Sequence, residues 1–553
     1  MSATTNEAKA LQACVACRKQ KRKCNKALPQ CYLCVRMGRR CDYSDITPSP
    51  NADDFANLRQ QVTSLEARLQ SQNRNAGLGW NEPMRPINWN SASSGSDSRC
   101  GLDATIFPSV FFLDTEFFNE AQMSNPKPTF PVPQDVANTL GTSILDIQDV
   151  VDRYFANIHV WLPFVSKKRM EFALCNPGLE LTADFALLLL AMKLIIQVPT
   201  GGPRGAISPL YLMTKKYYAA VEAAGIISLQ SLQANLLIAT YEIGHSIYPA
   251  AYVTTGHCAR IGHALGLHNR RDAPQLIKRK SGAWAEIEEA RRIWWVVMLL
   301  DRYVNLGSYQ HPLATGDPAM NDLLPADDEL WDEGQPTTSE PLYVSSASKV
   351  GASAFARCCQ ATHLIGRLIR LLNDRPSDAT LRFPEAIQLH RTIQALTNLL
   401  PDDVQRAPQR FGTALALCHG ALLHLYDPFC CTEENRGEHT VEEMEMQTIS
   451  LNGMKAVASD VLHFSRTMRV TMEQDPAAIS PLMADCLYTA AATFAWMVYE
   501  TGTRDDAEAY HFLRKLLEIM SARWSVATQY LAILDKARVL LYPQAALLLE
   551  ING

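Results

Sequence analysis

The chain has 553 residues, with 52 Lys or Arg and 57 Asp or Glu, which gives a formal net charge of −5. This length provides for a large hydrophobic core or two merged subdomains. The polar N-terminus predicts no secretory signal. The longest apolar run, at 185–192, stops at Lys193, far short of the ~20 residues that a membrane span needs. We therefore expect no membrane partner.

A regular group of cysteines occupies the first 41 residues, spaced C-x2-C-x6-C-x6-C-x2-C-x6-C: Cys14, Cys17, Cys24, Cys31, Cys34 and Cys41. The second three repeat the first three at an offset of 17 residues. In an intracellular chain such thiols favour a metal over disulfides, and zinc takes four thiolates in a tetrahedron. Six thiolates are too many for one tetrahedron and too few for two separate ones. We therefore predict two zinc ions that share two sulfurs.

The same region is strongly basic. Residues 1–45, which we call the head, carry ten basic and three acidic residues, whereas the rest of the chain carries 42 and 54. Concentrated positive charge on a small scaffold predicts phosphate neutralisation, and so double-stranded DNA as the partner. The charge is densest between the second and third cysteines, at Arg18, Lys19, Gln20, Lys21, Arg22 and Lys23. We expect this run to read DNA, with the alternative that the head is a structural zinc knob for protein contact.

The head resembles the fungal binuclear zinc cluster family of transcription factors, including Pro29 in the connecting loop and Tyr43 after the last cysteine. The resemblance implies that Cys14 and Cys31 are the bridging ligands. It also implies that the first short helix enters the major groove and that Lys21 is the base-reading lysine.

The residue before that lysine is Gln20, where the family usually has a basic residue. Members of the family often recognise CGG half-sites.

A short heptad pattern follows the head. Residues 46–54 are polar, contain two prolines and predict a linker. The segment 55–72 then places apolar residues at a/d spacing and predicts a short coiled-coil dimerisation helix: Phe55, Leu58, Val62, Leu65 and Leu69. The family keeps a dimerisation helix at this position, so we expect a homodimer. The alternative is an amphipathic helix docked on its own chain. Residues 73–109, rich in Asn, Ser, Gly and Pro, predict a disordered linker.

The remaining residues, 110–553, form what we call the body. Helix-length segments at 209–224, 251–266 and 286–305, and a leucine pattern behind Ser228 as N-cap, predict helices. Alternating β-type segments are scarce. We therefore predict a mostly α fold, composed of a small N-terminal binuclear zinc cluster, a short coiled coil and a large all-α regulatory domain.

Parts of the body resemble the family's middle homology region over about residues 150–335. The matching segments are Tyr154-Phe155 with His159 and Pro163, residues 262–268, residues 289–295 and Asp301-Arg302, with a weaker echo at Pro312 and Leu324-Pro325. Helix geometry favours a structural role for the charged and aromatic residues of this block. Glu288 and Arg292, at i and i+4, predict an ion pair beside a packed aromatic core.

Enzyme motifs are missing from the sequence. The segment around His245 lacks the closing glycine of a nucleophile elbow, no phosphate-binding loop follows Gly201, and no H-E-x-x-H occurs. The sequence therefore predicts a nuclear, zinc-dependent, sequence-specific DNA-binding transcription factor, not an enzyme, that regulates RNA polymerase II genes of a metabolic or biosynthetic pathway. The rivals are an RNA-binding or chromatin adaptor, and an enzyme with an accessory zinc cluster.

The regulatory partners are less defined by the sequence. Coregulators and a small-molecule effector both fit a large acidic body. The acidic segment 327–333 is either a coactivator-recruiting motif or a solvated loop.

Overall fold

The computed structural model separates the chain into two compact units, residues 1–99 and 100–553. The residues that it describes are 10, 13–19, 24–36, 40–43, 109–121, 128, 130–141, 143–175, 181–200, 205–269, 283–307, 311–336, 341–346, 350–373, 379–430 and 440–541. In the first unit, two short helices belong to the head, α1 (Val15–Lys19) and α2 (Tyr32–Arg36). The second unit contains the body.

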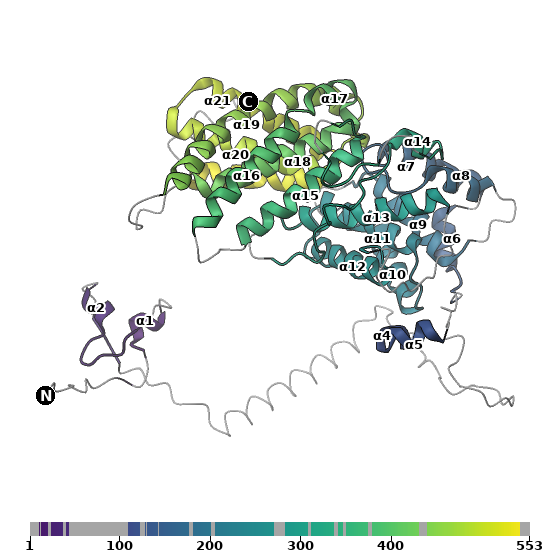
Figure 1. Cartoon of the computed structure of the whole chain (residues 1–553), viewed down its shortest axis with the longest axis horizontal. Helices are drawn as coiled ribbons and strands as arrows, with labels where there is room; N and C mark the ends of the chain where they lie inside the picture. The colour runs from purple at the N-terminus through teal and green to yellow at the C-terminus, as the bar shows by residue number, and fades with distance from the viewer. Residues whose placement is uncertain are drawn as a thin grey trace. The chain divides into compact units, whose positions relative to one another are not determined.

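The N-terminal half of the body is a bundle around two almost wholly buried helices, α9 (Ala183–Ile196) and α11 (Leu229–Gly244), which pack on each other. Figure 1 shows this half in blue and teal. Its helices are α4 (Val110–Leu113), α5 (Thr115–Glu120), α6 (Gln134–Leu140), α7 (Ile144–Asn157), α8 (Lys167–Cys175), α9 (Ala183–Ile196), α10 (Pro209–Ala223), α11 (Leu229–Gly244), α12 (Ala250–Ala264), α13 (Trp284–Tyr303) and α14 (Asp328–Asp332).

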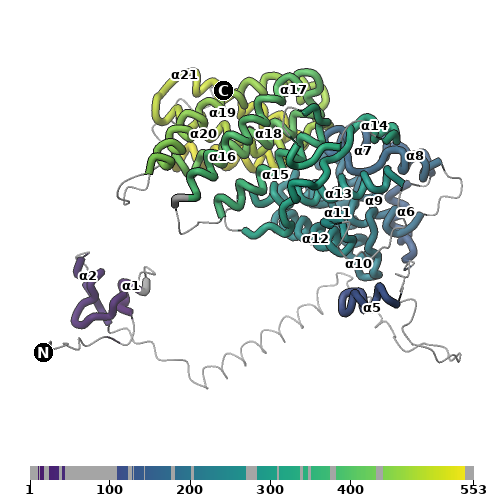
Figure 2. Tube along the Cα trace, viewed as in Figure 1, coloured from purple at the N-terminus to yellow at the C-terminus, as the bar shows by residue number. Residues whose placement is uncertain are grey.

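The C-terminal half, green to yellow in Figure 2, is built around α18, which packs against α15, α16, α19 and α20. Its helices are α15 (Ala354–Asn373), α16 (Ala379–Thr397), α17 (Pro401–Arg406), α18 (Pro408–Tyr426), α19 (Val441–Gln474), α20 (Ala484–Thr501), α21 (Arg504–Ser521) and α22 (Ser525–Leu541). Short 3-10 turns lie at Asp427–Phe429, Pro476–Ala478 and Pro481–Met483. One continuous hydrophobic core, from Val136 to Leu534, joins both halves.

Local sequence signals explain where these helices begin. The Ser228 side chain accepts a hydrogen bond from the Ser231 amide in a capping box, which confirms the predicted start of α11. Pro209 stands in the first turn of α10, where its missing N–H costs nothing. The predicted helices at 209–224, 251–266 and 286–305 are confirmed as α10, α12 and α13, within two residues at each end.

The prediction of a mostly α fold is confirmed. The described residues contain no β-strand, and an isolated β-bridge joins Leu323 to Tyr343. None of the described helices has the length and apolar character to cross a membrane.

Candidate metal centre and nucleic-acid interface

The 17-residue repeat of the sequence is a structural repeat in the head. Helices α1 and α2 each begin at the residue after a cysteine, Cys14 and Cys31, so their bounds also differ by 17 residues. Each helix carries the second cysteine of its half, Cys17 or Cys34, in its first turn. Two equivalent half-sites therefore face one centre.

The cysteine sulfurs at that centre have the spacing of a zinc–thiolate tetrahedron. Cys14 Sγ lies 3.8 Å from Cys31 Sγ and 3.7 Å from Cys34 Sγ, and Cys17 Sγ lies 3.8 Å from Cys31 Sγ. Four sulfurs at ~2.3 Å from a central zinc would be separated from one another by about 3.8 Å. The sulfur positions therefore fit zinc.

The sulfurs form two groups of four, each with all its atoms within 4.8 Å of one another. One group is Cys14, Cys17, Cys24 and Cys31, and the other is Cys14, Cys31, Cys34 and Cys41. Cys14 and Cys31 belong to both groups, which is the arrangement that two ions sharing two sulfurs require. When bound, each zinc would supply the positive charge that holds the four thiolates of its group together.

Burial makes the inner thiols hard to ionise without a metal. It raises the pKa of Cys17 to about 12 and raises that of Cys34 as well, in both cases together with neighbouring cysteines. Burial also acts to raise the pKa of Cys24, but the amides of Cys14 and Lys26 and the Tyr43 hydroxyl lower it to about 7. A zinc ion is the charge that allows such buried thiolates to persist.

Tyr43 holds the end of the second half against the first. Its hydroxyl donates to Ala27 O at 3.0 Å and lies 3.9 Å from Cys24 Sγ. The Val15 amide donates to Asp42 O at 2.9 Å, and the Cys31 amide donates to Cys41 Sγ at 3.2 Å. The aromatic residue that follows the last cysteine thus closes the cluster, a contact that its position in the sequence did not specify.

The predicted DNA-reading residues are only partly described. Arg18 and Lys19 lie in α1, immediately after Cys17. Gln20, Lys21, Arg22 and Lys23 lie outside the described residues, as do Phe55, Leu58, Val62, Leu65 and Leu69 of the predicted coiled coil. Their roles in DNA contact and dimerisation remain predictions.

In the body, the charged and aromatic block on α13 is structural, as predicted. Arg292 is fully buried, and its Nε donates to Glu288 Oε1 at 3.0 Å. Its other nitrogens donate to Asp328 Oδ1 at 2.8 Å and to the carbonyls of Pro163 and Ala326 at 3.1 and 2.8 Å. The Glu288 pair follows from helix spacing, whereas the other partners lie at least 34 residues away and have no signal in the sequence.

The acidic segment 327–333 does not match the interpretation of a solvated loop. Residues 328–332 form α14, Trp331 is 1% exposed, and the Arg292 guanidinium lies 4.1 Å from its ring centroid. His159 stacks on the same ring, with 5.9 Å between centroids, and bonds Asp332 at 2.9 Å. The segment is therefore not a solvated loop, because its tryptophan anchors it in the core, whereas its recruitment of a coactivator stays a prediction.

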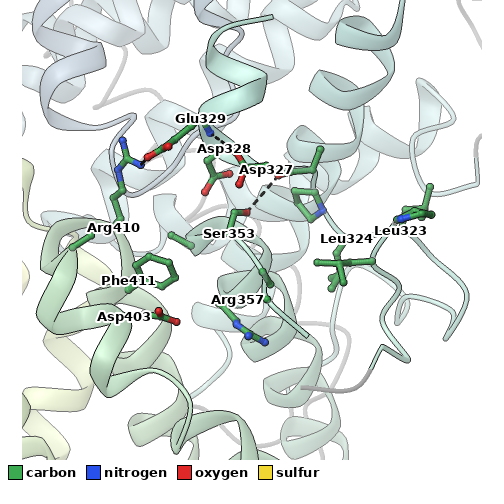
Figure 3. Close-up of a pocket in the computed structure, with 18 of the residues that line it drawn as sticks. Leu323, Leu324, Asp327, Asp328, Glu329, Ser353, Arg357, Asp403, Arg410 and Phe411 are labelled. Carbon is green, nitrogen blue, oxygen red and sulfur yellow. Dashed lines mark hydrogen bonds and ion pairs between the residues drawn. The ribbon is translucent and has the colours of Figure 1, made fainter. Parts of the chain in front are cut away.

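A pocket of about 730 Å³ lies beside α14, lined by residues of α13, α15, α17 and α18 (Figure 3). Several of its charges are neutralised within the protein. Arg410 pairs with Glu329 at 2.6 Å, and Arg406 pairs with Asp403. Asp328 is held by Arg292. The Arg410–Glu329 pair joins the two halves of the body, and the neutralised charges favour a structural role for this pocket.

Comparison with known families assigns both units. Residues 12–50 match the fungal Zn(2)-Cys(6) binuclear cluster domain, which binds two zinc ions, so the prediction of a binuclear cluster is confirmed. Residues 151–419 match the fungal specific transcription factor domain. This match extends well beyond the region of resemblance at 150–335 and ends within α18.

Several curated proteins are similar to the chain. Transcription factor BOA15 of Botryotinia fuckeliana is 39% identical over 185 residues, which span 33% of this chain and 98% of that protein. The citrinin biosynthesis transcriptional activator mrl3 of Monascus ruber is 24% identical over 64% of this chain and 71% of its own length. The sorbicillinoid biosynthetic cluster transcription factor 1 of Penicillium rubens is 24% identical over 68% and 66%. The sulfur geometry, the helical body and these matches together establish that the chain belongs to the fungal Zn(2)-Cys(6) transcription factors, zinc-dependent proteins that bind DNA sequence-specifically.

Proposed function

We propose that the protein is a nuclear, pathway-specific activator of RNA polymerase II genes in a biosynthetic pathway. Four similar proteins are named for the biosynthesis of citrinin, sorbicillinoids or depudecin. The names of three of these four proteins call them activators. The observation that carries the DNA-binding role is the pair of four-sulfur groups sharing Cys14 and Cys31 within a strongly basic head. The chain acts by binding, and we assign it no catalytic step.

The domain division follows the sequence. We propose a zinc cluster at 1–45, linkers at 46–54 and 73–109, a coiled coil at 55–72 and a regulatory body at 110–553. The start of α4 at Val110 supports the last of these boundaries.

We propose that Lys21 reads a guanine edge in CGG half-sites, while Lys19 contacts phosphate. Lys21→Ala should weaken binding to the specific duplex by about 1–3 kcal/mol and relax base preference. Lys19→Ala should weaken specific and scrambled duplexes alike and flatten the salt dependence. Fluorescence anisotropy with both duplexes measures this. Equal affinity of the unmodified protein for both duplexes would instead support an RNA-binding or chromatin adaptor.

We propose that residues 55–72 pair two chains on the DNA. A lysine at Leu65, on the apolar stripe, should abolish tight binding to paired half-sites, because a charge at a core position opposes helix pairing. Ser64→Lys adds the same charge on the outer face and is the matched control. Sedimentation of the full chain gives the oligomeric state, and equal dimerisation of both variants would assign the segment to an intrachain helix.

The activation surface that we propose is the pair of short helices α4 and α5, blue in Figure 1. Five of the chain's 18 phenylalanines fall within residues 107–118, and residues 100–126 contain no Lys or Arg. Phe112, Leu113 and Phe117 are 60%, 83% and 52% exposed. Phe111 and Phe118 are buried and pack against Ile227, which fixes the exposed side chains outward.

Acidic residues surround these exposed side chains, at Asp114, Glu116 and Glu120. An apolar surface rimmed by one sign of charge complements a groove with an apolar floor and a Lys/Arg rim. We therefore propose a coactivator domain with such a groove as the partner of this segment.

A reporter assay tests this surface. The double variant Phe112→Ser with Leu113→Ser should keep promoter occupancy by chromatin immunoprecipitation and lower transcription several-fold. Leu145→Ser removes another exposed leucine, 75% exposed on α7, and should leave transcription unchanged. Full transcription by the double variant would place activation elsewhere in the chain.

A further inference from the structure

A second pocket, of about 460 Å³, lies where the two halves of the body meet and has a chemistry different from that of the first. Four segments form it: the turn before α12 with the start of that helix, the end of α13 with the loop after it, the first turn of α20, and α22. The described residues that line it are Tyr248, Pro249, Tyr252, Tyr303, Val304, Gly307, His311, Asp485 and Tyr530. Its volume falls in the usual range for small-molecule sites, about 300–1,000 Å³.

Tyrosine is the main component of the wall. Tyr303 is 9% exposed, whereas Tyr252 is 36% and Tyr248 54% exposed, so the rings extend from the interior to the mouth. Tyr530 is held in place by stacking on Tyr488, with 4.5 Å between ring centroids and 17° between planes. Such rings offer electron-rich faces to a bound group.

The polar groups of the wall are largely unused by the protein. Among the described residues, the hydroxyls of Tyr248, Tyr252 and Tyr530 have no hydrogen-bond partner. The Tyr303 hydroxyl makes a long bond of 3.5 Å to Pro481 O. Convergent polar groups in an otherwise apolar pocket are the usual mark of a ligand site.

A single carboxylate gives the pocket its charge. Asp485 is 9% exposed, and within the described part of the chain its side chain has one hydrogen-bond partner, His424, at 3.0 Å. None of the described lining residues is Lys or Arg. Burial and then the Asp485 carboxylate raise the pKa of Tyr303 and of Tyr530, so both phenols stay neutral and lie within electrostatic reach of this carboxylate.

We propose that this pocket binds a small organic cation, an alkyl- or arylammonium compound, with its ammonium group at Asp485 and its hydrocarbon part among the tyrosine rings. The carboxylate attracts a cation through its negative charge. The neighbouring aromatic rings attract the same cation through their quadrupoles. The Asp485 carboxylate would repel an anion. The bound cation would contact α12, α13, α20 and α22 at once and so link the two halves of the body. The proposal deepens the regulatory role proposed for the body and rests on that role for its consequence in transcription.

Calorimetry on the purified full chain tests the site with three probes of nearly one shape. Tyramine is cationic, 4-ethylphenol is neutral and 3-(4-hydroxyphenyl)propanoate is anionic. We expect tyramine to bind at least about tenfold more tightly than 4-ethylphenol, since a hydrogen bond to a charged group contributes about 1.5–3 kcal/mol. The anion should show no binding. Calorimetry measures binding directly, so a failure of tyramine to bind would not change the outcome of the DNA-binding and reporter experiments that test the proposed function.

Variants locate the interaction. Asp485→Asn should weaken the binding of tyramine about tenfold and change the binding of 4-ethylphenol little. Asp505→Asn, which removes an exposed acid at the start of α21, is the control with the same change in net charge. Tyr252→Leu, at the rim of the pocket, removes an aromatic ring face but keeps an apolar side chain. It should weaken the binding of tyramine without disturbing the fold. Equal binding of all three probes, unchanged tyramine affinity in Asp485→Asn, or no binding of either tyramine or choline up to about 10 mM would overturn the proposal.

Discussion

The shared sulfurs of the head make a quantitative prediction about zinc content. Cys31 belongs to both four-sulfur groups, whereas Cys24 belongs to one. Cys24→Ala therefore leaves one complete set of four ligands, and Cys31→Ala leaves none. A structural zinc contributes about 10–16 kcal/mol of folding free energy, which is comparable to the whole stability of a typical domain, about 5–15 kcal/mol. A head this small has too little core to fold without that contribution.

Metal analysis of the purified full chain, after dialysis against metal-free buffer, measures the difference. We expect two zinc ions per chain in the unmodified protein, about one in Cys24→Ala and about none in Cys31→Ala, following the number of intact four-sulfur groups. Specific DNA binding should be lost in Cys31→Ala. Cys175→Ala removes an exposed cysteine outside the cluster and should keep both ions. Equal zinc content in Cys24→Ala and Cys31→Ala would refute the shared-sulfur arrangement.

Three further predictions concern the body. Gly262→Ala should lower the melting temperature of the body, because the added Cβ would lie 2.7 Å from Cζ3 of Trp294 and such overpacking costs about 1–3 kcal/mol; an unchanged melting temperature would contradict this. Arg292→Ala should lower the urea midpoint by the equivalent of about 3–5 kcal/mol, because it removes the fully buried guanidinium that pairs with Glu288 and Asp328. A loss below about 1 kcal/mol, the value of an ordinary exposed pair, would count against the network. Burial acts to lower the pKa of His424, but Asp485 raises it above its ordinary value. The stability from this pair is therefore fully present below about pH 6.5 and is lost as pH rises through the raised pKa. The melting-temperature difference between the unmodified protein and His424→Asn should shrink from about pH 5.5 to about pH 8.5, and a difference that grows would reverse the sign of this argument.

The sequence by itself determined the features that depend on neighbouring residues. Six cysteines lie within 28 residues of chain. Because zinc takes four thiolates in a tetrahedron, six thiolates are all used when two ions share two sulfurs. Caps and apolar periodicity located α10, α11, α12 and α13, because helix ends are decided by contacts over one turn. The Glu288–Arg292 pair followed from helix geometry in the same way.

Only the tertiary structure decided the features that join distant segments. The segment 327–333 has the composition of a solvated acidic stretch, and the burial of Trp331 between Arg292 and His159 reverses that expectation. The tyrosine pocket brings together Tyr248 and Asp485, which lies 237 positions further along the chain. No local sequence pattern predicts contacts between such distant segments. They arise from the packing of the whole core, whose free energy depends on the shapes and volumes of many side chains.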